Sequence, residues 1–217
     1  DVARVLSRYA DLIMARVFAH QSVVELARYA TVPVINGLSD REHPCQTIGD
    51  LLTIREKKGR LDGLIVAYIG DGNNVAASLL LGCALVGAEF RLACPEGYEI
   101  PSEIVKTAQR IGGGVSILRR PDETVRDADV VYTDVWTSMG QEAEAEKRRK
   151  AFSGYQITGD LLSKAPPDAV LMHPMPVHWG EELAEALSDC AQSVLIDQAE
   201  NRLHAQKAVL IELSRKG

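Results

Sequence analysis

Several polar side chains in this chain of 217 residues come directly after short apolar segments, and their types suit the binding of small charged ligands. Arg16 follows one such segment, and a guanidinium group can bind phosphate or carboxylate through two parallel hydrogen bonds. Asp134 follows another, where a carboxylate is a natural partner for an ammonium group. His43 and Gln46 lie three residues apart, so on a helix their side chains share a face and can hydrogen-bond one small planar ligand.

Each of these residues also has a structural interpretation that the sequence leaves open. Arg16 could be a surface residue, His43 a cap or core residue, and Asp134 part of a solvated turn. A metal site is not indicated, because Cys45 does not share a helical face with His43. The four cysteines are at least 11 residues apart and form no C-x-x-C pair, so we expect reduced thiols.

A glycine-containing loop, residues 70–74, follows the apolar segment 64–69 and precedes a helical pattern. It does not match the dinucleotide fingerprint, since Val75 stands where a third glycine is needed and Cys94 stands where the next strand should end in an acid. The loop instead offers the amides of Asn73 and Asn74 at a helix N-terminus. They suit the binding of a carboxylate, although capping of the helix is an equally reasonable role.

The segment 137–152 is long and charged, and it follows Asp134 closely. Ser138 and Met139 lie at its start. Loops of this length inside a compact domain are commonly lids, so the segment could close over a site; a solvated helix is the alternative.

From Gly63 onward, short apolar runs alternate with helical periods, which predicts a doubly wound α/β domain with a parallel sheet covered on both faces. In such sheets ligands bind at the carboxyl ends of the strands, where the polar clusters occur. We predict strands at 64–69, 90–94, 115–118, 129–134, 169–173 and 193–197, and helices at 75–86, 102–111, 123–128, 181–187 and about 200–216.

The first fifty residues predict part of a second α/β lobe, with strands at 12–16 and 32–36, a helix at 22–29, and a connecting helix at 47–57. The length corresponds to about 1.4 domains. The chain begins with Asp1 inside an amphipathic pattern, so we expect it to be cut from a longer protein. We predict three parts: residues 1–50, 51–197 and 198–217.

Composition limits the function further. The chain is 46% apolar and 25% charged, with a net charge of −6, which argues against disorder and against binding to nucleic acid or anionic lipid. No apolar run is long enough to cross a bilayer, and no signal peptide begins the chain. We expect a cytoplasmic protein.

Taken in order, six motifs resemble those of the ornithine carbamoyltransferase family, within the aspartate/ornithine carbamoyltransferase superfamily. The resemblance implies two α/β lobes, one for carbamoyl phosphate and one for the amino acid, with the last helix returning to the first lobe. It also implies a homotrimer or a multiple of trimers, no metal or organic cofactor, and formation of L-citrulline from carbamoyl phosphate and L-ornithine. The motifs are residues 14–18, 32–38, 43–46, 68–74, 134–142 and 199–202.

The resemblance also implies roles for individual residues. Arg16 and His43 would contact the carbonyl oxygen of carbamoyl phosphate, with Arg16 also on the phosphate, and Gln46 would orient the carbamoyl NH2. Arg202 would lie near the carbamoyl group, and the backbone carbonyls of the Pro174 and Met175 turn would accept from its NH2. The residues expected to bind ornithine are Asn74 at its α-carboxylate and Asp134, Ser138 and Met139 at its α-amino end.

The chain departs from the family pattern in two places. The family's Ser-x-Arg-Thr-Arg phosphate loop does not occur in the 217 residues. Residues 173–176 read His-Pro-Met-Pro where ornithine enzymes usually have His-Cys-Leu-Pro, a form closer to aspartate carbamoyltransferases. Three alternatives therefore stay open: another acceptor (aspartate, putrescine or an acylated ornithine), a non-catalytic amino-acid-binding module, and, least favoured, a nicotinamide-linked dehydrogenase.

Overall fold

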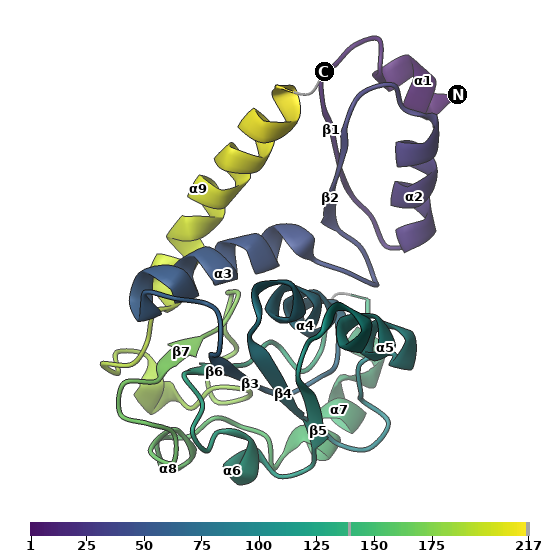
Figure 1. Ribbon diagram of the computed structural model, residues 1–217. Helices are drawn as coiled ribbons and strands as arrows, with labels where there is room; N and C mark the ends of the chain where they lie inside the picture. The colour runs from purple at the N-terminus through teal and green to yellow at the C-terminus, as the bar shows by residue number, and fades with distance from the viewer. Residues whose placement is uncertain (139, 216–217) are drawn as a thin grey trace.

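The computed structural model describes residues 1–138 and 140–215, and its strands form two parallel sheets (Figure 1). The larger sheet has the order β5-β4-β3-β6-β7, and all neighbouring strands in it are parallel. The smaller sheet pairs β1 with β2, also in parallel. The predicted α/β class with parallel sheets is confirmed. The strands are β1 Ile13–Arg16, β2 Val34–Leu38, β3 Ile65–Ile69, β4 Glu89–Ala93, β5 Val115–Leu118, β6 Val130–Tyr132 and β7 Val170–Met172.

Both faces of the larger sheet are covered. Side chains alternate along β3, so that Val66 and Tyr68 pack in one buried cluster with residues of α4 and α5, whereas Ala67 and Ile69 pack in a second cluster on the opposite face. Near-continuous apolar strands predict this double coverage. The helices are α1 Val2–Leu6, α2 His20–Tyr29, α3 Pro44–Lys58, α4 Asn74–Val86, α5 Ser102–Ile111, α6 Pro121–Thr124, α7 Ala145–Phe152, α8 Gly159–Leu162 and α9 Leu195–Ser214, with 3-10 turns η1 Glu142–Glu144 and η2 Glu185–Leu187.

Helix α4 packs against both the larger sheet and α3, and its sequence marks both of its ends. The Asn73 side chain accepts hydrogen bonds from two backbone N–H groups of the first turn, and Gly87 ends the helix with φ +78°. The helix also approaches α3 closely: a Cβ placed at Gly82 would lie 2.4 Å from Cγ2 of Thr47. Small residues on α4 therefore set how near α3 can come.

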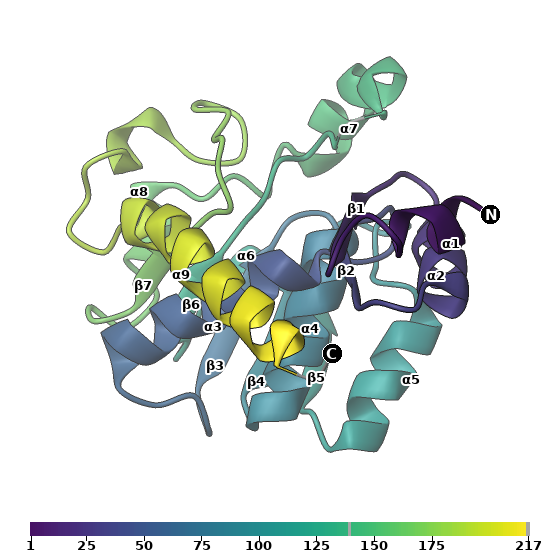
Figure 2. The ribbon, with the colours of Figure 1, turned by 90° about the horizontal axis from the view of Figure 1, so that it is seen from above.

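Helix α9 runs along α3 and then toward the smaller sheet (Figures 1 and 2). Lys57 and Asp197 form an ion pair of 2.6 Å, and the amide of Asn201 donates to Oγ1 of Thr53 at 3.0 Å. The predicted division at residues 50 and 197 stays a prediction. The helix and the smaller sheet share a cavity of about 290 Å³ whose lining includes Met14, Arg16, Ile35, Arg202, Gln206 and Val209.

The predicted helix over residues 181–187 is wrong, because only the short turn η2 forms there. The backbone pairs instead with the distant Ile157, whose N–H donates to the carbonyl of Glu182 at 2.9 Å and whose carbonyl accepts from Ala184 at 3.0 Å. Pairing over a distance in the sequence overrides the local helical pattern here.

The predicted strand over residues 193–197 is also wrong. It is reduced to a single bridge between Ser193 and Leu171, and α9 begins at Leu195. A short apolar run does not reveal by its periodicity whether it is a strand or the buried start of a helix.

The helix predicted at 123–128 lies earlier in the chain, as α6. Pro121 occupies its first turn, where the missing N–H is not needed. Asp127 has φ +61°, which a helix does not allow, so the helix cannot extend over it.

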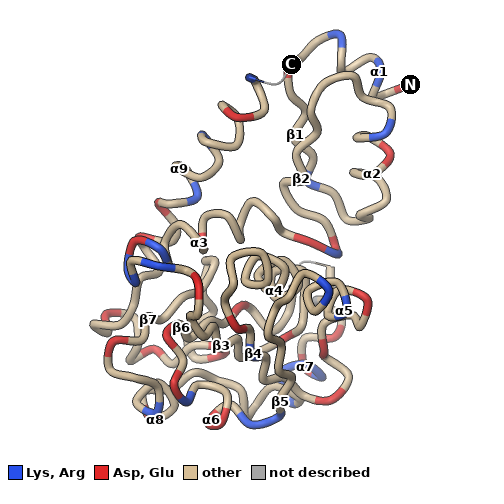
Figure 3. Tube along the Cα trace, in the orientation of Figure 1, with Lys and Arg blue, Asp and Glu red and all other residues tan. Residues whose placement is uncertain are grey.

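Charges are mixed along the chain. Lys and Arg alternate with Asp and Glu along the loops around the larger sheet (Figure 3). Within the part of the chain that the structure describes, no helix has the length and apolar character that crossing a bilayer requires.

Candidate active site

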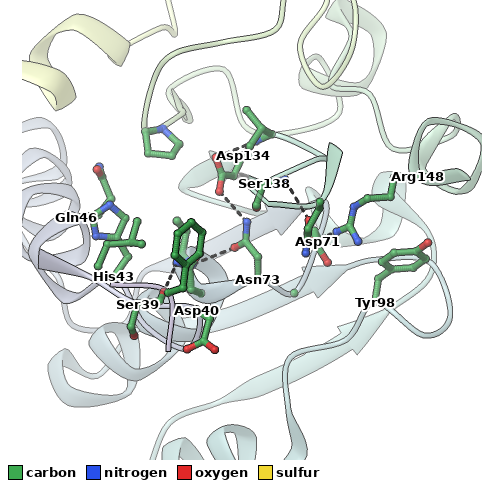
Figure 4. A pocket seen from close by; sticks show the side chains of 18 of the residues that line it. Ser39, Asp40, His43, Gln46, Asp71, Asn73, Tyr98, Asp134, Ser138 and Arg148 are labelled. Atoms are coloured by element: carbon green, nitrogen blue, oxygen red, sulfur yellow. Dashed lines mark hydrogen bonds and ion pairs between the residues drawn. The ribbon is translucent and has the colours of Figure 1, made fainter. Parts of the chain in front are cut away.

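A cavity of about 800 Å³ lies between the two sheets, at the carboxyl ends of strands from both (Figure 4). This is the edge at which open α/β sheets bind ligands. The structure brings nine of the ten predicted site residues to this cavity; the tenth, Met139, lies outside the described residues. The nine are Arg16, His43, Gln46, Asn74, Asp134, Ser138, Pro174, Met175 and Arg202.

One side of the cavity is built from β1, the start of α3 and α9. Gln46 is buried, and its amide nitrogen donates to Oδ1 of Asp50 at 2.8 Å, while its amide oxygen accepts from Arg202. On the other side of Arg202, the amide oxygen of Gln206 can accept from Nη2 at 2.7 Å and from Nε at 2.8 Å. The Arg202 guanidinium is thus held between two carboxamides, with Arg16 on the same wall.

His43 precedes the first turn of α3 but does not cap it, since its side chain makes no cap hydrogen bond. Burial, followed by the charges of Arg202 and Arg16, lowers the pKa of His43 to about 4. The imidazole is therefore neutral at pH 7. Its Nδ1 atom is buried without a hydrogen-bond partner among the described residues, so the ring has polar capacity left for a ligand.

The two asparagines of the glycine-containing loop have different roles. Asn73 caps α4, as the structural interpretation proposed, and its amide nitrogen also donates to Oδ2 of Asp134 at 2.8 Å. Asn74 donates to the carbonyl of Ser39 at 2.7 Å and lines the cavity. Asn74 therefore links the loop after β3 to the loop after β2 across the cavity.

Asp134 is 7% exposed, so the alternative of a solvated turn is wrong. Its Oδ1 accepts from the N–H of Val135 at 2.8 Å and its Oδ2 from Asn73. Burial raises the pKa of Asp134, whereas the nearby His173 lowers it. Ser138 follows in the same loop, where its N–H donates to the amide oxygen of Gln141 at 3.1 Å. A buried carboxylate at this edge is a suitable partner for a ligand ammonium group.

Asp71 and Arg148 form a buried ion pair that the sequence did not single out, with side chains 9% and 5% exposed. Arg148 also donates through Nε to the carbonyl of Trp136 at 2.5 Å, and its guanidinium lies 5.0 Å from the ring centre of Tyr98. Burial raises the pKa of Asp71 to about 6, against the lowering effect of Arg148. The pair fastens α7 to the loop after β3 at the edge of the cavity.

Segment 137–152 contains helix α7, which is solvated on one side only, because Arg148 and Phe152 are buried. That the segment closes over the site stays a prediction. The sequence signal was weak, since Arg148 stands between Lys147 and Arg149 and nothing in the local pattern separates the buried cation from the exposed ones.

The turn after β7 forms the remaining wall. The N–H of His173 donates to the amide oxygen of Gln198 at 2.8 Å, and its Nε2 lies 3.0 Å from Oε1 of the fully buried Glu182. Pro174 and Met175, which follow, line the cavity. The turn is thus held by Gln198 of α9 and by Glu182, which lies in the segment that follows the turn.

Among the described residues, one group has the spacing of metal ligands. His178, Glu181 and Glu182 bring ligand atoms within 4.8 Å of one another. Both carboxylates already have partners, because Glu181 pairs with Arg149 at 2.8 Å and Glu182 pairs with His173. The group lies outside the cavity lining.

The fold and the cavity define an α/β ligand-binding protein in which cationic groups line one wall and a buried carboxylate lines the other. Two family models match the chain: the carbamoyl-P binding domain of aspartate/ornithine carbamoyltransferase over residues 1–56, and the Asp/Orn binding domain over residues 62–213. The chain belongs to the aspartate/ornithine carbamoyltransferase family.

Individual relatives agree with this assignment. The chain is 56% identical over 214 residues to the anabolic ornithine carbamoyltransferase of Pyrococcus furiosus, covering 97% of this chain and 68% of the relative, and 53% identical to the ornithine carbamoyltransferase of Methanosarcina mazei, covering 99% and 71%. The solved Pyrococcus furiosus structure has a TM-score of 0.92 over the same shares. The anabolic enzyme of Campylobacter jejuni has a TM-score of 0.94 at 39% identity, covering 100% of this chain and 73% of its own.

Proposed function

We propose that the protein transfers the carbamoyl group of carbamoyl phosphate to the δ-amine of L-ornithine, giving L-citrulline and phosphate. The observation that carries the proposal is the composition of one cavity: Arg16, Arg202 and the neutral His43 on one wall, and the buried Asp134 on the other. Relatives at 53–56% identity are named for this activity.

The cationic wall would bind carbamoyl phosphate. Arg16 is a donor for the phosphate and the carbonyl oxygen, and His43 donates a second hydrogen bond to that oxygen. As the amine attacks the carbonyl carbon, negative charge develops on the oxygen, and donors already aimed at it stabilise the transition state. The amide oxygen of Gln46 accepts from Arg202 with one lone pair and can accept from the carbamoyl NH2 with the second. The backbone carbonyls of Pro174 and Met175 would also accept hydrogen bonds from that NH2 group.

The opposite wall would orient the amino acid. Asp134 and Ser138, together with Met139, would hold the α-amino end, and Asn74 the α-carboxylate, so that the neutral δ-amine faces the carbonyl carbon. The nitrogen–carbon bond forms, the carbon–oxygen bond to phosphate breaks, and the leaving phosphate takes the amine proton. Orientation of the two substrates supplies much of the rate, and no covalent enzyme intermediate is needed.

The test is a citrulline assay on the full-length protein that contains this chain, because the Ser-x-Arg-Thr-Arg loop is not among the 217 residues. We expect saturable citrulline formation that depends on both substrates. A panel of amines (ornithine, aspartate, putrescine and acylated ornithine) tests the acceptor, for which the His173 to Pro176 turn leaves open alternatives. Turnover of another amine with no citrulline would reject the ornithine assignment.

A non-catalytic role is tested by calorimetry beside the citrulline assay. Calorimetry on the full-length protein would then detect ornithine binding without binding of carbamoyl phosphate, and no product would form with any amine. We expect both ligands to bind.

We further propose that the protein works in arginine biosynthesis in the cytoplasm, as a homotrimer or a multiple of trimers, with residues 1–50 and 198–217 contributing to the carbamoyl phosphate lobe and 51–197 forming the ornithine lobe. The name of the Pyrococcus furiosus relative, which includes the word anabolic, supports the biosynthetic direction. Light scattering coupled to gel filtration measures the assembly, and a monomeric mass would contradict it.

A further inference from the structure

Asp50 is a buried carboxylate that no step of the proposed reaction uses. It lies on α3 with 0% of its surface exposed and accepts three side-chain hydrogen bonds from three elements. The amide nitrogens of Gln46 and Gln198 donate to Oδ1 at 2.8 Å and 2.7 Å, and the hydroxyl of Tyr132 donates to Oδ2 at 2.9 Å.

Burying a carboxylate at this position carries a desolvation cost. Burial opposes its ionisation and raises the pKa of Asp50 to about 6, even though Gln46, Gln198, Tyr132 and Arg202 all favour the charged form. An apolar side chain between helices avoids this desolvation cost. The stability of the α3–α9 contact alone therefore gives no reason for Asp50.

The carboxylate determines which way two carboxamides point. An ionised carboxylate only accepts hydrogen bonds, so both glutamines must turn their NH2 groups toward Asp50 and their oxygens away from it. The oxygen of Gln46 then meets Arg202 at the cavity, and the oxygen of Gln198 accepts the N–H of His173, which precedes the Pro174 and Met175 turn.

We propose that Asp50 is a positioning residue for the carbamoyl side of the site: through Gln46 it orients Arg202, and through Gln198 it holds the turn of Pro174 and Met175. The inference rests on the proposed function. One carboxylate thus couples two walls of the cavity that come from different parts of the chain.

The main test is Asp50→Asn in the full-length protein. The side chain keeps its shape but loses its charge and gains a donor, so neither carboxamide is required any longer to turn its NH2 group toward residue 50. We expect the KM for carbamoyl phosphate to rise at least tenfold and kcat to fall at least tenfold, while the KM for ornithine changes less than threefold. Calorimetric titration with carbamoyl phosphate gives a second readout, with an expected tenfold weaker affinity.

Tyr132→Phe is the matched control. It removes one donor from the same carboxylate and a longer contact of 3.2 Å between its hydroxyl and the Gln198 amide, but it leaves the shorter contacts of both glutamines with Asp50 in place, so stability falls but the kinetic constants stay within threefold of wild type. Equal kinetic losses in Asp50→Asn and Tyr132→Phe would show a merely structural role and overturn the proposal.

A double-mutant cycle tests the route through Arg202. If Asp50 acts partly by orienting Arg202, adding Asp50→Asn to Arg202→Met lowers kcat/KM by a smaller factor than Asp50→Asn does in the wild-type protein, because the oriented group is already gone. Full multiplication of the two losses would overturn this route, as would unchanged kinetics in Asp50→Asn, which would mean that Gln206 alone suffices to hold Arg202.

A third variant covers the case in which Asp50→Asn does not fold. Gln198→Met removes the link between Asp50 and the His173 turn and leaves the contact of Gln46 with Asp50 in place, and we expect at least a fivefold rise in the KM for carbamoyl phosphate; wild-type constants would overturn the proposal. Wild-type protein that neither binds carbamoyl phosphate nor forms product contradicts the proposed function itself, which is a separate outcome from active wild type with unaffected variants.

Discussion

The imidazole of His43 owes its protonation state to burial first and then to two arginines from opposite ends of the sequence. Burial, followed by the charges of Arg202 and Arg16, holds its pKa at about 4, so the ring donates a hydrogen bond as a neutral group throughout the physiological range. The cationic guanidinium groups attract an anion, and the neutral imidazole donates a hydrogen bond to one of its oxygens.

Replacing His43 therefore tests catalysis more than binding. We expect His43→Asn to lower kcat of the full-length protein by about a hundredfold, the usual effect of losing one donor to a developing oxyanion, with a small change in the KM for ornithine. Steady-state kinetics with both substrates measures this. A change confined to KM would show that His43 acts in the ground state only.

The lowered pKa of His43 also affects stability. Since the folded pKa lies below the unfolded value of 6.5, the unfolded chain binds a proton that the folded chain does not. The lowered pKa leaves the free energy of unfolding unreduced above pH 6.5. Below pH 6.5 the free energy of unfolding falls as the pH drops toward 4, by up to about 1.4 kcal/mol per pH unit. Urea unfolding of wild type and His43→Asn at pH 7.5, 6.0 and 5.0 measures it. A difference that does not shrink on acidification would contradict the shifted pKa.

At this scale the sequence was informative for residues at or after the ends of strands, as with Arg16, His43 and Asp134. These three reach the cavity, and so does Arg202 of α9, which the family resemblance singled out. Asp71, Arg148 and Asp50 were missed, because their importance comes from burial and from partners up to 148 residues away, which local spacing does not reveal.

Helix α7 is anchored by two buried side chains, Arg148 and Phe152. Arg148 joins it to Asp71 and to the carbonyl of Trp136, beside the loop that carries Asp134 and Ser138. Without this contact, α7 loses its attachment to the loop after β3, whereas Asp134 keeps its own through Asn73.

We expect Arg148→Met to destabilise the protein by about 3 kcal/mol, since it leaves the Asp71 carboxylate buried and unpaired, and to raise the KM for the amino-acid substrate. Arg149→Met is the control: that side chain is 58% exposed and pairs with Glu181 at the surface, so its loss costs less than about 0.5 kcal/mol. Chemical unfolding and KM measurements on both variants decide. Equal losses of stability in Arg148→Met and Arg149→Met would contradict the role given to the Asp71–Arg148 ion pair.

The contact between α3 and α4 gives a second prediction. Gly82→Ala places a methyl group 2.4 Å from Thr47 and 3.2 Å from Leu51, so the helices must separate, at a cost of about 1–3 kcal/mol partly offset by better helix propensity. Gly154→Ala meets no atom within 4 Å and is the control. Thermal unfolding compares them, and a stabilised Gly82→Ala would show that α3 can move without cost.

Elements with strong periodicity and clear ends were predictable, as with α4, α5 and β3 to β5. The segment from 181 to 197 was not, because Glu182 and Ser193 take part in pairings with Ile157 and Leu171 that no local pattern records. A buried polar residue such as Glu182 is especially hard to predict, because a hydropathy pattern assigns polar residues to the surface.

For the whole molecule, the two sheets differ in how well they are covered. Every residue of β3 except Ile65 is buried, whereas all five residues of β2 are only partly buried, and Val2, Tyr9, Met14 and Phe18 around the smaller sheet are exposed. The smaller sheet thus has little core of its own within this chain.

We expect this asymmetry to appear in amide hydrogen exchange on the chain of 217 residues. Amides of β3 and β6 should exchange only through global unfolding, while those of β1 and β2 exchange orders of magnitude faster through local opening. Mass spectrometry of peptic fragments measures both. Equal protection of the two sheets would show that α9 and α3 stabilise the smaller sheet fully.

The two-lobe plan was predictable from the sequence because the alternation of strands and helices and the order of the polar clusters survive in linear form. The path of α9 was not derivable from pattern, since it depends on contacts such as Lys57 with Asp197 and Asn201 with Thr53, which join residues 140 and 148 positions apart.

Asn73 restricts how this protein can be redesigned. Its oxygen is required by the start of α4, and its NH2 is required by Asp134. Aspartate would keep the cap but face a second carboxylate, and serine is too short to reach in both directions, so amide chemistry at this length is needed on both counts. Libraries that alter acceptor preference should therefore leave position 73 fixed, even though its neighbour at position 74 is the one expected to contact the ligand.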